Sequence, residues 1–117
     1  MFQTQLLLEK RKEINEVFAD HGDFSVQILG LPDPIGSSRR TDVEILINLD
    51  KAKDEDIVVF VPNTSQVLGQ IRAVERHDFC MDVLSKLKLL LGCSVNVVDE
   101  QALKKNYPMT YAARPNA

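Results

Sequence analysis

Two short β-rich runs in the middle of the chain constrain its fold more than any other feature. Thr41–Leu49 is rich in β-branched residues, and its first half alternates polar with apolar side chains, the pattern of a strand with one buried face. Ile57–Val61 is apolar throughout and fits either a fully buried strand or a buried helical turn, which periodicity cannot separate. A charged segment, Asp50–Asp56, connects the two runs. The rest of the chain therefore has to cover a small sheet.

Helical periodicity lies on both sides of these runs. Apolar residues recur at three- and four-residue steps from Thr4, which has the side chain of an N-cap, to Asp20. A broad apolar stripe predicts a longer helix from Thr64, its expected cap, to Leu91, and Gly92 ends it. We expect this stripe to belong to the core and not to a partner groove. The other expected elements are a strand at 24–29, a loop at 31–40, a strand at 94–98, a short helix at 100–105 and an irregular tail at 106–117.

These elements predict one α/β (α+β) domain over residues 1–117, in which helices flank a small mixed β-sheet. The 117 residues match the usual size of a single domain, and a hydrophobic content of 44% is enough to fill one modest core. A fold of this class specifies no chemistry, so any function has to be argued from particular residues.

Charge and cysteine content exclude several classes of protein. A formal net charge of -3 gives no field that attracts a phosphate backbone, so we expect no nucleic-acid binding. No apolar run approaches the roughly 20 residues of a membrane-spanning helix. Cys80 and Cys93 lack the spacing of a zinc site and cannot build a disulfide framework. We expect both to be reduced and buried in a cytoplasmic protein.

A pair of acidic residues marks the candidate site. Asp42 and Glu44 are two positions apart in the first β-rich run, so their side chains are expected to project from the same face of the strand. Such a pair is often only the solvated side of a strand. Here it also follows a glycine, Gly30, at a defined separation, because ten residues lie between Gly30-Leu31 and Asp42.

With this spacing the chain resembles the minimal nucleotidyltransferases, small members of the DNA polymerase β-like superfamily. Their signature is a strand ending in Gly-Ser, ten intervening residues, and Asp-x-Asp on the next strand. Gly30-Leu31, Pro32–Thr41 and Asp42-Val43-Glu44 stand in these places. The resemblance covers residues 7–103 and implies a nucleotidyltransferase-like fold.

The downstream part of the chain extends the resemblance. The family has a helix ending in Leu-Leu-Gly, a strand of the form Val-Asp-Val-Val, and an acidic residue before Ala-Leu. This chain has Leu90-Leu91-Gly92, Val95-Asn96-Val97-Val98 and Asp99-Glu100-Gln101-Ala102-Leu103. The segment between Asp50 and Arg76 is longer than the corresponding link in the family.

The resemblance implies nucleotidyl transfer with magnesium, in which paired metal ions clamp the attacking and leaving oxygens. Asp42 and Glu44 would hold the metal, since Mg²⁺ prefers oxygen ligands. Asn96 occupies the third-carboxylate position, and its neutral amide cannot act as a general base.

The resemblance also implies a site for ATP or another nucleoside triphosphate. Gly30 and the backbone amide of Leu31 would contact the phosphates, although Leu31 lacks the hydroxyl of the family's serine. Arg39 and Arg40 would reach the same phosphates from the loop before the acidic pair.

Three of the marked positions depart from the family, at Leu31, Glu44 and Asn96. We therefore expect a binding or regulatory protein with an eroded metal site and no assigned catalytic residue. The resemblance implies an antitoxin-like partnership with a HEPN-domain protein, or a homo-oligomer. The alternatives are an active magnesium-dependent enzyme, transferring a nucleoside monophosphate to a protein hydroxyl or a small molecule, and a structural domain without nucleotide affinity.

Overall fold

A computed structural model describes residues 2–32, 41–63, 65, 67, 71 and 75–114, and the structural statements below concern these residues. The sheet has five strands in the order β2-β1-β3-β4-β5, with β1 parallel to β3, β4 parallel to β5, and the other pairs antiparallel. The predicted α/β (α+β) class with a mixed sheet is confirmed. The elements are α1 (Phe2–Glu9), α2 (Arg11–Ala19), β1 (Val26–Ile28), β2 (Leu31–Pro32), β3 (Val43–Ile47), β4 (Ile57–Val61), α4 (Arg76–Leu91), β5 (Val95–Asp99), α5 (Glu100–Asn106) and α6 (Pro108–Ala112).

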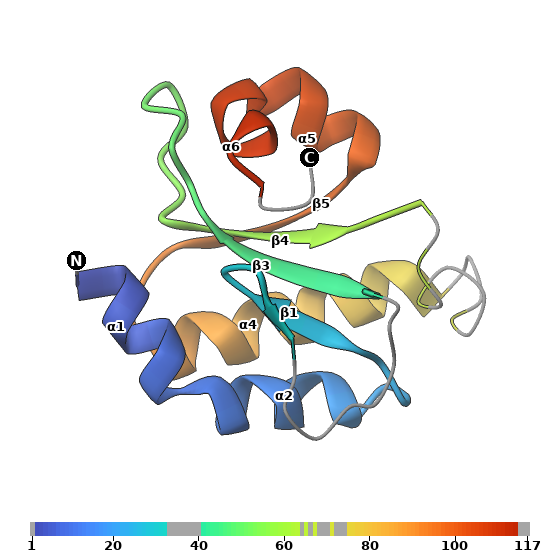
Figure 1. Ribbon diagram of the computed structural model, residues 1–117. Helices are drawn as coiled ribbons and strands as arrows, with labels where there is room; N and C mark the ends of the chain where they lie inside the picture. The colour runs from blue at the N-terminus through green and yellow to red at the C-terminus, as the bar shows by residue number, and fades with distance from the viewer. Residues whose placement is uncertain are drawn as a thin grey trace.

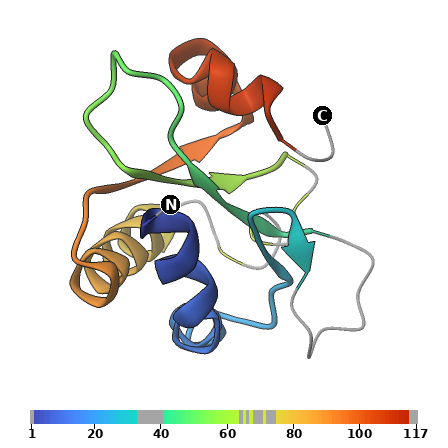
Figure 2. The same cartoon turned by 60° about the vertical axis from the view of Figure 1, so that its left-hand side comes forward.

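The helices form a layer on each face of the sheet. Helices α1, α2 and α4 cover one face, and α5 and α6 cover the other (Figure 1; Figure 2 shows the same two layers from the side). Strand β4 lies inside the sheet, and all five of its residues are buried. A strand covered on both faces reads as a continuous apolar run, so Ile57–Val61 is a strand and not a helical turn.

Two separate apolar clusters hold these layers to the sheet. The larger lies under α1, α2 and α4 and includes Ile45 and Val59 from the central strands. The smaller lies under α5 and α6 and consists of Leu46, Val58, Phe60, Val98, Leu103 and Tyr107. Side chains alternate between the two clusters along β3 and β4, as the pleat of a strand requires.

The predicted helix at 4–20 is in fact two helices. It begins at Phe2, so Thr4 lies inside α1 and is not its cap. Lys10 separates α1 from α2 with φ -97° and ψ 13°, while the Ile14 amide still donates to the Lys10 carbonyl at 2.9 Å. Because the backbone hydrogen bonds continue through the break, the apolar periodicity on either side carries no sign of it.

The predicted helix at 64–91 is shorter in the described structure. Its cap at Thr64 lies outside the described residues, and α4 begins at Arg76. Gly92 ends it with φ +66°, and its amide donates to the Lys88 carbonyl at 2.8 Å, as expected for a glycine cap. The apolar side of α4 packs in the larger cluster, which confirms its role in the core. None of the described helices is long and apolar enough to cross a membrane.

The tail predicted to be irregular contains a helix. Pro108 stands in the first turn of α6, and the helix has no cap of its own. Instead the Asp50 carboxylate accepts hydrogen bonds from the Met109 amide at 3.0 Å, the Thr110 amide at 2.9 Å and the Thr110 hydroxyl at 2.6 Å. The cap comes from about 60 positions earlier in the chain, so no local pattern in the tail predicts the helix.

Cys80 and Cys93 are both free thiols. Both side chains are only partly buried, whereas we expected both to be fully buried. Burial raises the pKa of the Cys80 thiol, and burial together with the Asp56 charge raises the pKa of Cys93. A thiol with a raised pKa is a poor nucleophile, so neither cysteine suits covalent catalysis.

Candidate functional site

Asp42 and Glu44 are buried at one end of β3. Their exposed fractions are 0% and 2%, which excludes a solvated acidic face. Glu44 is paired in register with Phe60 of β4, on the sheet face under α5 and α6. Asp42 stands one position before β3, and its Oδ2 accepts a hydrogen bond from the Ser25 amide at 2.8 Å. Two carboxylates removed from water need charged or hydrogen-bonding partners.

The partner of Glu44 is Arg114, two residues beyond α6. Its Nε donates to Glu44 Oε1 at 3.0 Å and its Nη2 to Oε2 at 2.6 Å, which is the paired fork geometry of an arginine–carboxylate bridge. The Arg114 side chain is only 12% exposed. Its guanidinium carbon lies 4.6 Å from the centre of the Phe60 ring and 5.6 Å from that of Tyr111. The guanidinium therefore balances the charge of Glu44 and packs against the two neighbouring aromatic rings.

The loop after β3 positions the segment that carries Arg114. Asp50 caps α6 as described above, and the Leu49 amide donates to the Thr110 hydroxyl at 2.9 Å. The Asn48 Oδ1 accepts from the Asp50 amide at 2.8 Å and so orients the capping residue. The loop after β3 therefore fixes the first turn of α6. The side chain of Arg114, which follows α6, contacts Glu44 within β3.

The hydrogen bonds to Asp50 lower the pKa of its carboxyl. Burial alone would raise the pKa of this carboxyl, but the bonds from the Thr110 hydroxyl and the Thr110 and Met109 amides outweigh it. The net result is a pKa below the ordinary value of 3.8. Asp50 is consequently ionised at neutral pH, where a negative charge at the N-terminus of α6 is favourable.

Arg114 leaves little room for a metal ion at Glu44. A magnesium ion bound to this carboxylate would lie roughly 4 Å from the guanidinium, a repulsion of about 8 kcal/mol at an effective dielectric constant near 20. Within the described part of the chain, no three His, Cys, Asp or Glu side chains are grouped so that they could hold a metal. The side chains in this arrangement do not fit a two-metal centre.

Asn96 does not lie beside the acidic pair. It is on β5, and its Nδ2 donates to the Tyr107 hydroxyl at 3.0 Å. Strand β4 separates it from β3, and its register partner Val58 pairs with Leu46 and not with Glu44. Glu44 and Asn96 are separated by two strand spacings across the sheet and by two residues along the strands. Their Cα atoms are therefore about 12 Å apart.

Gly30 and Leu31 form a tight turn at the sheet edge. Leu29 and Gly30 have φ of 52° and 81°, as in the two-residue turn of a β-hairpin, and Leu31 begins β2. Because β1 runs parallel to β3 with Ile28 beside Ile45, Gly30 lies level with Ile47. This is the end of β3 opposite to Asp42, about 16 Å along the strand. Arg39 and Arg40 lie outside the described residues. Of the predicted residues that the structure describes, Asp42 and Glu44 are the ones that lie together.

We expect that Asn96→Asp, which restores the carboxylate of the family pattern, creates no magnesium-dependent ATP binding, because the new group remains about 12 Å from Glu44. The Tyr107 hydroxyl already interacts with the Glu55 carboxylate, so it cannot fully satisfy a second carboxylate, and the free energy of unfolding should fall by about 1–3 kcal/mol. Titration calorimetry with ATP and magnesium, together with urea denaturation, measures both quantities. Tighter ATP binding in the variant that requires magnesium would contradict the strand order described here.

The two residues that organise this site, Asp50 and Arg114, are not among those singled out in the sequence. Arg114 follows Tyr111-Ala112-Ala113, and nothing in that segment points to a partner 70 positions earlier. The one available signal is indirect: a buried Glu44 requires a cation, and arginine is the usual choice for a buried ion pair.

Comparison of the chain with protein-family models, with curated proteins and with solved structures finds no match. The likeness to minimal nucleotidyltransferases remains a prediction from residue spacing.

Proposed function

We propose that this chain is a nucleotidyltransferase-like protein that acts by binding another protein and no longer transfers nucleotides. The observation that carries the proposal is the buried pair of Glu44 and Arg114. The pair engages both oxygens of the carboxylate that would otherwise hold magnesium, and it places a positive charge where a dication would bind. An ion pair of this kind stabilises the fold, and it leaves the Glu44 carboxylate unavailable for metal-assisted nucleotidyl transfer.

The environment of Asn96 supports the same proposal. A transfer enzyme needs a base near the reacting hydroxyl, within hydrogen-bond reach directly or through one water. The Asn96 amide cannot accept a proton, and its hydrogen bond to Tyr107 joins β5 to the C-terminal helices. Burial raises the pKa of the Tyr107 hydroxyl, so this residue stays neutral and is a poor substitute base.

The partner implied by the resemblance is a HEPN-domain ribonuclease, with this chain in the role of its antitoxin in the cytoplasm. Where such a ribonuclease is encoded beside this chain, the two proteins are expected to copurify, and the ribonuclease activity is expected to fall in the complex. A mixture of the two proteins that stays separate in size-exclusion chromatography would remove this partner class.

Titration calorimetry of the purified protein with ATP, with and without magnesium, tests the loss of transfer chemistry. We expect no magnesium-dependent binding, because Arg114 occupies the Glu44 carboxylate. Asp42→Asn is the informative variant, and Asp54→Asn, which changes an exposed carboxylate in the loop after β3, is its matched control. Magnesium-dependent ATP binding that Asp42→Asn abolishes and Asp54→Asn retains would overturn the proposal in favour of the active enzyme.

A further inference from the structure

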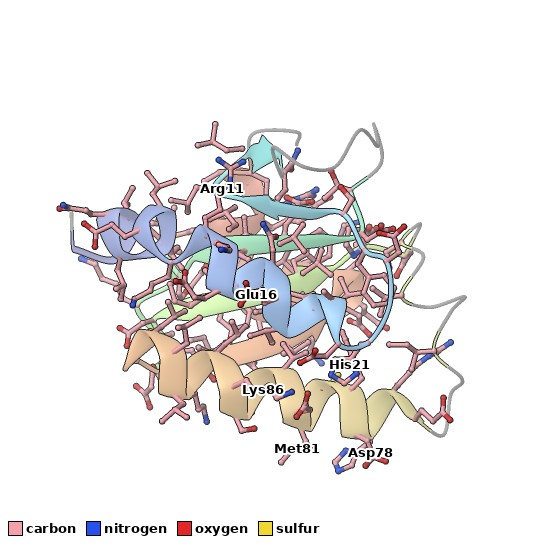
Figure 3. The ribbon with its side chains drawn as sticks, turned by 90° about the horizontal axis from the view of Figure 1, so that it is seen from below. Arg11, Glu16, His21, Asp78, Met81 and Lys86 are labelled. Carbon is pink, nitrogen blue, oxygen red and sulfur yellow. The ribbon has the colours of Figure 1, made fainter. Side chains whose placement is uncertain are left out.

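A solvent-open cavity lies between α2 and the segment that connects it to β1. Its volume is about 590 Å³, within the ~300–1,000 Å³ of most small-molecule sites. Side chains of α1 and α2 form one wall, and residues 22–24 form the other. Figure 3 shows Arg11, which lines the cavity, on the side of α2 that faces away from α4. The cavity is separate from the pair of Glu44 and Arg114, which lies on the opposite face of the sheet.

Two polar atoms of the residues that line this cavity are buried without hydrogen-bond partners. They are Arg11 Nε, which is a donor, and Asn15 Oδ1, which is an acceptor. The two residues are four positions apart on α2, so their side chains are neighbours, yet they do not bond one another. Arg11 also makes no ion pair with any described residue. Unsatisfied buried polar atoms are costly, so this donor and acceptor point to a ligand that supplies an acceptor and a donor side by side.

The rest of the lining combines an apolar surface with acidic groups. Leu8, Ala19 and Phe24 provide apolar contacts. Glu16 and Asp23 add carboxylates that make no hydrogen bond or ion pair within the described part of the chain. Since the Arg11 guanidinium has the opposite charge, the cavity suits a molecule that has an apolar body and carries one charge of each sign.

We propose that this cavity binds a free α-amino acid with a large apolar side chain, of which phenylalanine is the representative. The carboxylate of the ligand accepts hydrogen bonds from the Arg11 guanidinium, and its ammonium group donates to Asn15 Oδ1 and balances the charge of Asp23. Its side chain packs against Leu8 and Phe24. Because the cavity is open to solvent, we expect a dissociation constant on the order of 100 µM. The inference is independent of the nucleotide site, so either proposal can fail without the other.

Titration calorimetry with L-phenylalanine and three reduced forms of it tests the ligand class. The compound 3-phenylpropanoate lacks the ammonium group, 2-phenylethylamine lacks the carboxylate, and glycine lacks the apolar side chain. We expect phenylalanine to bind at least ~10-fold more tightly than each of them, because each omits one of the three contacts. The proposal is overturned if phenylalanine does not bind at concentrations up to ~10 mM, or if 3-phenylpropanoate binds equally tightly.

Two substitutions test the location of the site. Arg11→Gln should weaken phenylalanine binding at least ~10-fold, whereas Lys105→Gln, which removes an exposed cation from the other helical layer, should leave it unchanged. Asn15→Leu removes the acceptor and keeps the side-chain size. It should weaken phenylalanine binding at least ~5-fold without weakening that of 3-phenylpropanoate, a difference that loss of folding cannot produce. Phenylalanine binding that Arg11→Gln leaves unchanged, or equal losses for the two compounds in Asn15→Leu, would refute the assigned contacts.

Discussion

Arg114→Ala is expected to lower the free energy of unfolding by about 3–5 kcal/mol, because it breaks a buried ion pair by removing one partner. The change leaves the Glu44 carboxylate buried without its counter-charge, and it removes the guanidinium from the faces of Phe60 and Tyr111. Urea denaturation at neutral pH, followed by circular dichroism, measures the loss. The midpoint should fall without a large change in slope if the folded state keeps its compactness.

Two further variants separate the charge from the packing. Arg114→Lys keeps the charge but not the paired hydrogen bonds of the guanidinium. It should therefore lower the free energy of unfolding by less, on the order of 1–2 kcal/mol. Glu44→Leu combined with Arg114→Met replaces the ion pair by apolar groups of similar volume and should recover most of the loss, because neither charge is then left buried alone. If Arg114→Ala costs less than about 1 kcal/mol, the ion pair contributes no more than an exposed one.

Asp50→Asn is expected to cost about 2–3 kcal/mol at neutral pH. The amide keeps the shape of the side chain but loses the charge that accepts three hydrogen bonds at the start of α6. One of its two terminal atoms becomes a donor facing other donors. Asp54→Asn, in the same loop but exposed, is the matched control and should change stability by less than ~0.5 kcal/mol.

The effect of Asp50→Asn depends on pH with a definite sign. The pKa of Asp50 is lowered in the folded protein, so its contribution is complete above the unfolded pKa of about 3.9 and is lost as the pH falls through the folded pKa. The difference in unfolding free energy between the native chain and Asp50→Asn should therefore be constant from pH 7 to about pH 5 and shrink below pH 4. A difference that grows on acidification would contradict the assigned capping role.

Local patterns in the sequence predict most of the elements that form the sheet and its first helical layer. The β-branched composition of Thr41–Leu49 and the uniform apolar run of Ile57–Val61 both correspond to strands, and Gly92 ends α4 as its position indicates. Helix α6 could not be found in this way, because the side chain that caps it is that of Asp50, which the fold brings from another part of the chain. Residue periodicity reflects local structure and contains no signal of contacts between distant parts of the chain.

The candidate site is predictable only in part for the same reason. Of the predicted acidic pair, Glu44 lies in β3 and Asp42 stands one position before it, and both side chains are buried and not on a solvated face. The long segment between Asp50 and Arg76 contributes β4, which pairs between β3 and β5 and so keeps Asn96 away from the pair. Residue spacing alone contains no information about which strand is inserted between two others.

The two faces of the sheet are completed at different times as the chain is synthesised. Helices α1, α2 and α4 and four of the five strands precede β5, whereas the layer over Leu46, Val58 and Phe60 comes wholly from residues after Asp99. A growing chain therefore presents this apolar face, with Glu44 still unpaired by Arg114, until α5, α6 and Arg114 have emerged. Exposed apolar surface in an incomplete fold favours aggregation. Chaperone binding to this face of the sheet is therefore most useful during this interval.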